Sequence, residues 1–183
     1  MRFSLLTAAL AAGAIMLAGC AKDASREITG SYSYKTSGTL TLVESKYTSM
    51  TAEQIATLKE SGEKVDTIVV GLSPEQGQMH ILDAGGQEGS AIITFNDILG
   101  NADITGGTYS ENYLKLDKGH TKTVYLTNDG ALRLGSGIVE YYGEGAKYED
   151  MLLLNLTYEG EVSLIDKDMT IIGSDVHCVA QYN

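Results

Sequence analysis

Tryptophan is missing from this sequence of 183 residues, and proline occurs once and cysteine twice. Two cysteines are too few for a small domain stabilised by several disulfides. Positive charge is also scarce, because 13 Lys and Arg residues stand against 24 Asp and Glu residues, and the formal net charge at pH 7 is −11. This balance argues against a nucleic-acid partner, which binds basic surfaces.

The longest apolar run is too short to cross a bilayer, which takes about 20 residues in a helix. It covers residues 5–17, follows the single basic residue Arg2, and has the length of a signal-peptide core. The run ends in the four residues LAGC at positions 17–20. This tetrapeptide resembles the lipobox of bacterial lipoproteins, so the sequence predicts a lipoprotein signal peptide.

The lipobox resemblance implies that the Cys20 thiol receives a diacylglyceryl group and that cleavage removes residues 1–19. More than one acyl chain makes such an anchor stable, since each buried CH₂ contributes about 0.8 kcal/mol. Ala21 stands where lipoproteins held at the inner membrane of enteric bacteria tend to carry Asp, so we expect the outer membrane, on either face. Residues 20–27 are small and polar and predict a tether. Residues 28–183 are long enough for one domain with its own core.

The composition is typical of an all-β protein. The chain has 21 glycines and 11 tyrosines, with frequent Val, Ile and Thr. Cys178 has no disulfide partner once Cys20 is lipidated, and we expect it to be a small buried apolar residue. Alternating or β-branched segments predict strands at residues 28–34, 39–42, 67–72, 79–82, 91–95, 113–116, 124–127, 131–142, 151–158, 169–172 and 176–182.

Turn signals separate these candidate strands. Residues 73–77 surround the only proline and predict a reversal of the chain. Residues 117–120 and 128–130 predict hairpins, because each contains a glycine that adopts positive φ easily. Residues 85–89 are rich in glycine but precede no helix, so they predict a hairpin loop rather than a phosphate site.

One short helix is predicted near residues 51–60. Thr51 and Gln54 fit a capping box, and Ile55 and Leu58 share a face that we expect to pack weakly against something larger. Strands joined by short turns must protect the edges of their sheet. A single antiparallel meander does this best by closing into an up-and-down β-barrel of about 8–10 strands, with a two-sheet sandwich as the alternative.

The first candidate strand resembles that of the lipocalin and calycin group. There a Gly-x-Trp triplet closes one end of the barrel, and here Gly30-Ser31-Tyr32 stands in its place, with tyrosine for tryptophan. Residues 28–182, with the lipobox and the short tether before them, are similar to the calycin-like lipoproteins of Gram-negative bacteria. True lipocalins carry a helix after the last strand, whereas this sequence places one after the second. The resemblance implies a calycin-like barrel and carries over no functional residue.

Residues with catalytic or metal-binding chemistry do not form a recognisable motif. His80, His120 and His177 fit no zinc-ligand spacing, so we expect hydrogen-bonded or exposed strand histidines. The segment at 135–137, Gly-Ser-Gly, is only a fragment of a nucleophile elbow. The acidic pairs at positions 159/161 and 166/168 could be imagined as glycosidase carboxylates, but we expect them to be solvated. The sequence therefore predicts no catalytic residue, no cofactor and no metal site.

Tyrosine joins an apolar body to a polar tip, which suits a cup for a small amphipathic or sugar-like ligand. Tyrosines also pack across strands in a core, and large leucines at alternate positions favour a filled interior. The tyrosines in or near candidate strands are Tyr32, Tyr34, Tyr109, Tyr113, Tyr125, Tyr141, Tyr142, Tyr148, Tyr158 and Tyr182. The leucines expected to face inward are Leu40, Leu42, Leu132, Leu134, Leu152, Leu154 and Leu156.

Two hypotheses follow from these patterns. The first is a lipid-anchored cell-envelope β-barrel protein, without enzymatic activity, that binds a small apolar or amphipathic ligand. The alternative is an envelope interaction module, in which a filled barrel binds a protein or a glycan through its loops. In both, Cys20 attaches the chain to a membrane. The sequence identifies neither the ligand nor the residues that would bind it.

Overall fold

The computed structural model describes residues 28–62, 64–85, 89–128, 132–165 and 167–183. The predictions for Cys20, the signal peptide and the tether lie outside these residues. Within the described part of the chain, no helix combines the length and the apolar character needed to cross a membrane.

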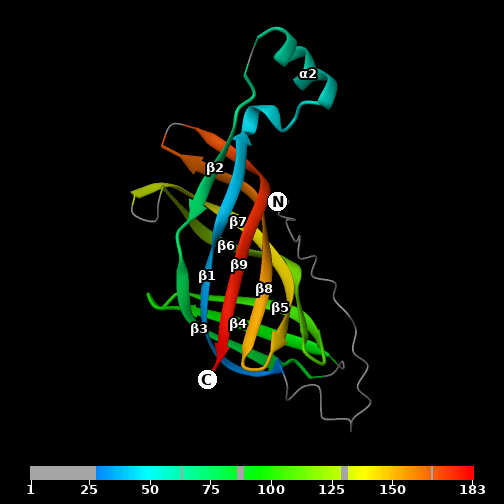
Figure 1. The fold of residues 1–183 in the computed structure, drawn as a ribbon, viewed down its shortest axis with the longest axis vertical. Helices are drawn as coiled ribbons and strands as arrows, with labels where there is room; N and C mark the ends of the chain where they lie inside the picture. Colours follow the sequence, from blue (N-terminus) through cyan, green and yellow to red (C-terminus); the bar gives the residue numbers. More distant parts are fainter. Residues whose placement is uncertain (1–27, 63, 86–88, 129–131, 166) are drawn as a thin grey trace, which may run out of the picture.

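The fold is all-β and consists of a single antiparallel sheet of nine strands that closes into a ring (Figure 1). From β3 onward each strand pairs with the next one in sequence, and β9 completes the ring by pairing with β1. The strands are β1 (Gly30–Glu44), β2 (Thr67–Leu72), β3 (Glu75–Asp83), β4 (Ser90–Asp97), β5 (Ala102–Ser110), β6 (Tyr113–Asn128), β7 (Leu132–Tyr148), β8 (Met151–Leu164) and β9 (Asp168–Tyr182). The sequence signals missed β5 and split β1, β6 and β9 into two segments each.

Strands β2 and β3 lie end to end along one edge of β1. The first half of β1 pairs with β3, the second half pairs with β2, and both partners are antiparallel to it. The chain therefore does not reverse at residues 73–77, and that prediction is wrong. Pro74 cannot donate a ladder hydrogen bond, but its fixed φ is compatible with extended backbone. It interrupts the pairing and lets the chain move from β6 on one side to β4 on the other.

Strand β6 is continuous, so the hairpin predicted at residues 117–120 is also wrong. Leu116 pairs with Gly143 and His120 with Tyr141, which leaves residues 117–119 opposite the single residue Tyr142. This is a β-bulge, and Gly119 adopts φ +96° within it. A glycine with positive φ serves a bulge as well as a turn, so the local signal was real but ambiguous. At the other end of β6, pairing with β7 continues to Asn128, and residues 129–131 lie outside the described chain.

The predicted helix, α2 (Ala52–Glu60), follows a 3-10 turn, η1 (Ser45–Tyr47), in the connection from β1 to β2. Thr51 and Gln54 form the capping box that the sequence indicates. The helix projects beyond one end of the ring (Figure 1), and among its described side chains only Leu58 is even half-buried. The side chain of Ile55, the other member of the predicted apolar face, lies outside the described side chains, so the packing of this face stays a prediction. Helix α2 follows the first strand, because β1 is one strand and not two.

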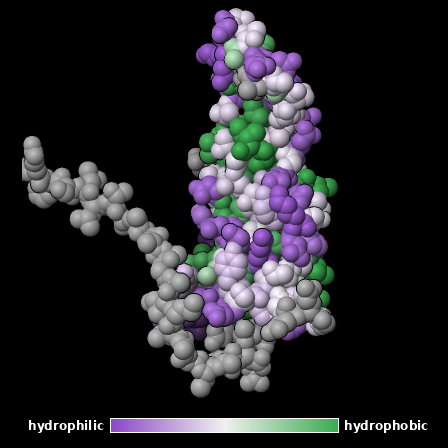
Figure 2. All heavy atoms as spheres, turned by 90° about the vertical axis from the view of Figure 1, so that its right-hand side faces the viewer, coloured by the Kyte–Doolittle hydropathy of each residue, from purple (hydrophilic) through white to green (hydrophobic). Residues whose placement is uncertain are grey.

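The interior of the ring is filled by its own side chains. Leu40, Leu42, Leu152, Leu154 and Leu156 are buried as predicted. Leu134 is only partly buried, and the side chain of Leu132 is not described. Cys178 is a free, buried thiol, which confirms that prediction. On the outside, the face in Figure 2 mixes hydrophilic and hydrophobic residues along its length.

Tyr32 packs at the end of the ring where the described chain enters the sheet. Its side chain is fully buried, and its hydroxyl donates a hydrogen bond of 2.6 Å to the carbonyl of Ile28. The ring of Tyr182 meets it edge-on, with 5.2 Å between centroids. Gly30 has φ +144°, and a Cβ there would lie 2.5 Å from Tyr182. Only glycine fits at this position without displacing the aromatic pair.

Candidate ligand-binding site

The wall of the ring has a gap beside β6. At one end of the gap β2 pairs with β6 through two residues, Gly71 with Thr127 and Leu72 with Leu126. At the other end β5 pairs with β6 from Gly107 onward. Between these two pairings, residues 117–124 of β6 have no ladder partner on this side within the described chain.

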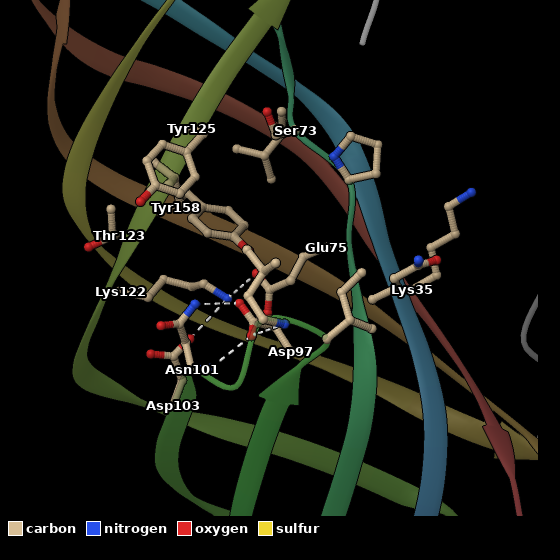
Figure 3. A pocket seen from close by; sticks show the side chains of 16 residues that line it. Lys35, Ser73, Glu75, Asp97, Asn101, Asp103, Lys122, Thr123, Tyr125 and Tyr158 are labelled. Atoms are coloured by element: carbon tan, nitrogen blue, oxygen red, sulfur yellow. Dashed lines mark hydrogen bonds and ion pairs between the residues drawn. The ribbon is translucent and has the colours of Figure 1, made fainter. Parts of the chain in front are cut away.

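A cavity of about 550 Å³ occupies this gap (Figure 3). Its walls are the end of β2, the start of β3, the turn between β4 and β5, and the middle of β6. This volume lies within the range of small-molecule sites, about 300–1,000 Å³. The cavity thus lies in the wall of the ring, where the pairing on this side of β6 is interrupted.

A buried ammonium group spans the gap. Lys122 is 8% exposed, and its Nζ lies 2.5 Å from Glu75 Oε2 and 3.2 Å from Asp103 Oδ2. These side chains come from β6, β3 and β5, and Figure 3 shows Lys122 reaching across to both carboxylates. The Tyr34 hydroxyl donates a hydrogen bond of 2.6 Å to Glu75 Oε1. Side-chain ion pairs thus connect strands that the backbone ladder leaves apart at this point.

A further carboxylate, that of Asp97, holds the turn between β4 and β5. Asp97 Oδ1 accepts hydrogen bonds of 2.8 Å from the backbone N–H groups of Leu99 and Asn101, and Oδ2 accepts one of 2.7 Å from the Asn101 amide. The hydrogen bond from the Asn101 side chain is the main reason that the pKa of Asp97 lies below its ordinary value. The Asp97 carboxylate is therefore ionised at neutral pH.

Four aromatic side chains pack one against the next inside the closed sheet, near the ion pairs of Lys122. Tyr34 meets Phe95 at 5.3 Å, Phe95 meets Tyr141 at 6.4 Å, and Tyr141 stacks on Tyr158 at 6.3 Å between centroids. Lys122 Nζ lies 5.5 Å from the centroid of the Tyr141 ring. Burial is the main cause that raises the pKa of Tyr141, and the nearby carboxylates of Asp103 and Glu75 add to it. Within the described chain, the buried Tyr141 hydroxyl has no hydrogen-bond partner.

Exposed apolar side chains lie at the mouth of the cavity, next to the polar residues Gln76 and Thr123. Ile98 and Leu99, on the turn between β4 and β5, are 70% and 81% exposed, although turns usually carry polar residues. Val124 and Leu72 line the cavity from β6 and β2. Tyr125 stands at its margin, where the Arg133 guanidinium lies 3.8 Å from the ring centroid. The cavity therefore combines exposed apolar side chains at its mouth with a charged and aromatic floor.

The sequence-derived candidates are scattered around this site. Of the tyrosines that the sequence places in or near strands, Tyr125 and Tyr158 line the cavity, and the others pack in the core or lie outside it. His80 hydrogen-bonds Ser31, and neither His120 nor His177 lines the cavity. Among the described residues, no group of three His, Cys, Asp or Glu side chains could hold a metal ion.

A second groove, of about 500 Å³, lies along the bulge in β6. Lys118 covers the face of the Tyr142 ring, with 4.0 Å from Nζ to the centroid. Both side chains bind the exposed carboxylate of Glu159, and the hydrogen bond from Tyr142 is the main cause that lowers its pKa. The face of the Tyr142 ring in this groove is thus covered by the protein's own lysine.

One feature of the sequence indicates a buried charge at this site. Lys122 alternates with Val124 and Leu126, so a lysine occupies the inward face of a strand. A long cationic side chain in that position needs a buried counter-charge. Its partners, Glu75 and Asp103, cannot be identified from the sequence pattern, because they belong to strands far away in the chain.

Comparison with protein-family models, curated proteins and solved structures gives no significant match.

Proposed function

We propose that this protein is a lipid-anchored cell-envelope protein that binds a small amphipathic ligand in the side cavity. The observation that carries this proposal is the cavity itself, a space of about 550 Å³ with exposed apolar side chains at its mouth and a charged, aromatic floor. A ligand with an apolar body and a polar end satisfies both parts of this lining. The filled interior directs the ligand to the side cavity and not to the centre of the ring.

We propose further that the fold is a calycin-like up-and-down β-barrel. Two features support this: the meander order of β3 to β9 closed by β1, and the buried Tyr32 at the position of the Gly-x-Trp tryptophan. Binding without catalysis fits a protein of this kind, because the described residues that line the side cavity include no nucleophile paired with a general base.

A neutral fluorescent probe, N-phenylnaphthylamine, tests the binding site. Residues 21–183 contain the whole described core and are suitable for the assay. Ile98→Ser removes an apolar side chain at the mouth of the cavity. We expect it to weaken probe binding by about threefold to tenfold, because burying an isoleucine even in part gains about 1 kcal/mol.

Ile138→Ser is the matched control, since Ile138 on β7 is 71% exposed, about the same as Ile98 at 70%, and does not line the cavity. We expect this variant to bind the probe as the wild type does. Equal affinity of all three proteins, or no binding at all, would contradict a ligand site in this cavity. If the probe binds as expected, native mass spectrometry of the protein purified from its own envelope would identify the natural ligand as an added non-covalent mass.

The anchor is tested by Cys20→Ser in the full chain. Without the thiol, no thioether to diacylglycerol can form, and we expect the protein to lose its acyl mass and to leave the outer-membrane fraction. A variant that remains there with an unchanged lipid mass would disprove lipidation at Cys20. Failure of this test would leave the cavity proposal untouched.

The filled interior and the projecting helix α2 favour one second candidate, an interaction module that binds an envelope protein or glycan. Its test is chemical crosslinking in the envelope with and without residues 48–62, the segment around α2. A crosslinked partner that disappears with this segment, together with a bare polypeptide mass in native mass spectrometry, would favour the module over the carrier.

A further inference from the structure

We propose that the ligand of the side cavity carries a positive charge at its polar end. This inference rests on the proposed function, because it assigns the chemical class of the ligand for the same cavity. Three observations support it. The described lining carries more negative than positive charge, one oxygen of the Asp103 carboxylate has no contact among the described residues, and the floor of the cavity is aromatic.

Negative charge exceeds positive charge inside the cavity. Glu75, Asp97 and Asp103 supply three carboxylates, whereas Lys122 is the only inward-facing ammonium group among the described residues of the lining. Lys35 also borders the cavity, but it alternates with the buried Tyr34 and Thr36, so its side chain lies on the outer face. A ligand with an ammonium group would reduce this excess, and an anionic ligand would increase it.

The hydrogen-bond and ion-pair partners of the three carboxylates indicate which of them can bind a ligand. Both oxygens of Glu75 are in use, Oε1 by Tyr34 and Oε2 by Lys122. Asp97 uses both of its oxygens to hold its own turn. Among the described residues, Asp103 contacts Lys122 through Oδ2, which leaves Oδ1 for a ligand, and its side chain is 29% exposed.

An anionic headgroup has no comparable site. It would have to bind Lys122, whose ammonium already lies between two carboxylates at 2.5 and 3.2 Å. To approach Nζ, the anion would come close to both carboxylates, and like charges at such distances repel strongly where water is partly excluded. No other inward-facing cation lines the cavity within the described chain.

The aromatic floor suits a cation as well. Tyr158 lines the cavity and stacks on Tyr141, whose buried hydroxyl has no partner among the described residues. Ring faces attract ammonium groups, and aromatic cages that include carboxylates are a recurrent way to bind quaternary ammonium ligands. The geometry therefore favours a ligand whose cationic end approaches Asp103 and Tyr158 while its apolar body rests between Ile98 and Val124.

The test uses three probes that share one apolar body: phenylbutyltrimethylammonium, phenylbutyl sulfate and phenylbutanol. Each competes with N-phenylnaphthylamine for residues 21–183. We expect the ammonium probe to displace the dye at about one tenth of the concentration that the alcohol needs, and the sulfate to be the weakest. Raising NaCl from about 50 mM to about 500 mM should reduce this preference, because salt screens the charges at the mouth.

Asp103→Asn keeps the shape of the side chain and removes its charge. We expect it to weaken the ammonium probe by about tenfold and to leave the alcohol unchanged. Asp175→Asn is the matched control, since that carboxylate lies on β9 with its side chain 80% exposed, and it should change neither probe. The salt dependence of the wild type provides a second test if Asp103→Asn folds poorly.

The outcomes separate the inference from the proposed function. If the sulfate or the alcohol competes as well as the ammonium probe, the cavity binds ligands but the charge assignment is wrong. If Asp175→Asn weakens the ammonium probe as much as Asp103→Asn does, attraction to the acidic surface explains the preference and the inference fails. If neither the dye nor any probe binds, the proposed function fails as well.

Discussion

The Nζ atom of Lys122 on β6 lies 2.5 Å from Oε2 of Glu75 on β3, across a stretch where the described chain forms no backbone ladder between those strands. The second contact of Lys122, to Asp103, joins β6 to β5. The same three side chains form the floor of the cavity. Lys122, Glu75 and Asp103 therefore connect the strands and also line the proposed ligand site.

The first prediction concerns this link. Lys122→Met retains the apolar stem but leaves Glu75 and Asp103 facing each other without a counter-charge. Removing one partner of a buried ion pair is strongly destabilising, and we expect a loss of about 2–4 kcal/mol in the free energy of unfolding, measured by urea titration. The matched variant is Lys122→Met combined with Glu75→Gln and Asp103→Asn, which should recover most of the loss. If stability is not recovered, the loss comes from altered packing of the side chain and not from the unpaired carboxylates.

A pH dependence is expected from Asp97. Its pKa is lowered, chiefly by the Asn101 side chain, so the unfolded state binds this proton more tightly than the folded state. The contribution to stability is thus complete above the ordinary pKa of about 3.8 and is lost as the pH falls through the lower, folded value. Wild type should be more stable than Asp97→Ala at pH 6, and the difference should shrink below pH 4, as measured by thermal unfolding. A difference that stays constant from pH 6 to pH 2.5 would rule out this role of the charge.

Cys178 should be unreactive in the folded protein. The thiol is fully buried, and burial is the main cause that raises its pKa to about 12. Since the thiolate is the reacting species, we expect residues 21–183 to resist a disulfide-exchange reagent at pH 8 until urea unfolds them. The control is Ser136→Cys in the same chain, a half-buried position on β7. Rapid labelling of Cys178 in native buffer would contradict the closed packing of β1 against β9.

Gly30 should tolerate no side chain. Gly30→Ala places a Cβ 2.5 Å from Tyr182 at φ +144°, and we expect a loss of about 1–3 kcal/mol in the free energy of unfolding. Gly62→Ala is the control, because Gly62 also has a positive φ, +88°, but nothing lies within 4 Å of its Cβ. A similar loss in both variants would mean that φ alone matters and that the contact with Tyr182 does not.

Local patterns in the sequence determined much of the fold. Alternation in segments such as residues 39–42 and 151–158 placed Leu40, Leu42 and Leu154 on the inner face, because successive side chains of a strand point to opposite sides. The Thr51–Gln54 capping box also formed as indicated, since a cap depends only on residues within one turn. These features need no information about distant parts of the chain.

Other features depended on which strands meet. Pro74 and Gly119 carry turn signals, yet the chain continues through both, because their neighbours pair with the long strands β1 and β7 instead of folding back. Local residues specify a turn or a bulge equally well, and the pairing of distant strands decides between them.

The candidate site was decided by tertiary structure almost entirely. The sequence by itself determined that Lys122 faces inward, through its alternation with Val124 and Leu126. Its partner Glu75 is 47 residues away, and it reaches Lys122 only because β2 and β3 share one edge of β1 and leave a gap beside β6. Periodicity records which face a side chain occupies, whereas the closure of the ring decides which side chain from another strand lies opposite it.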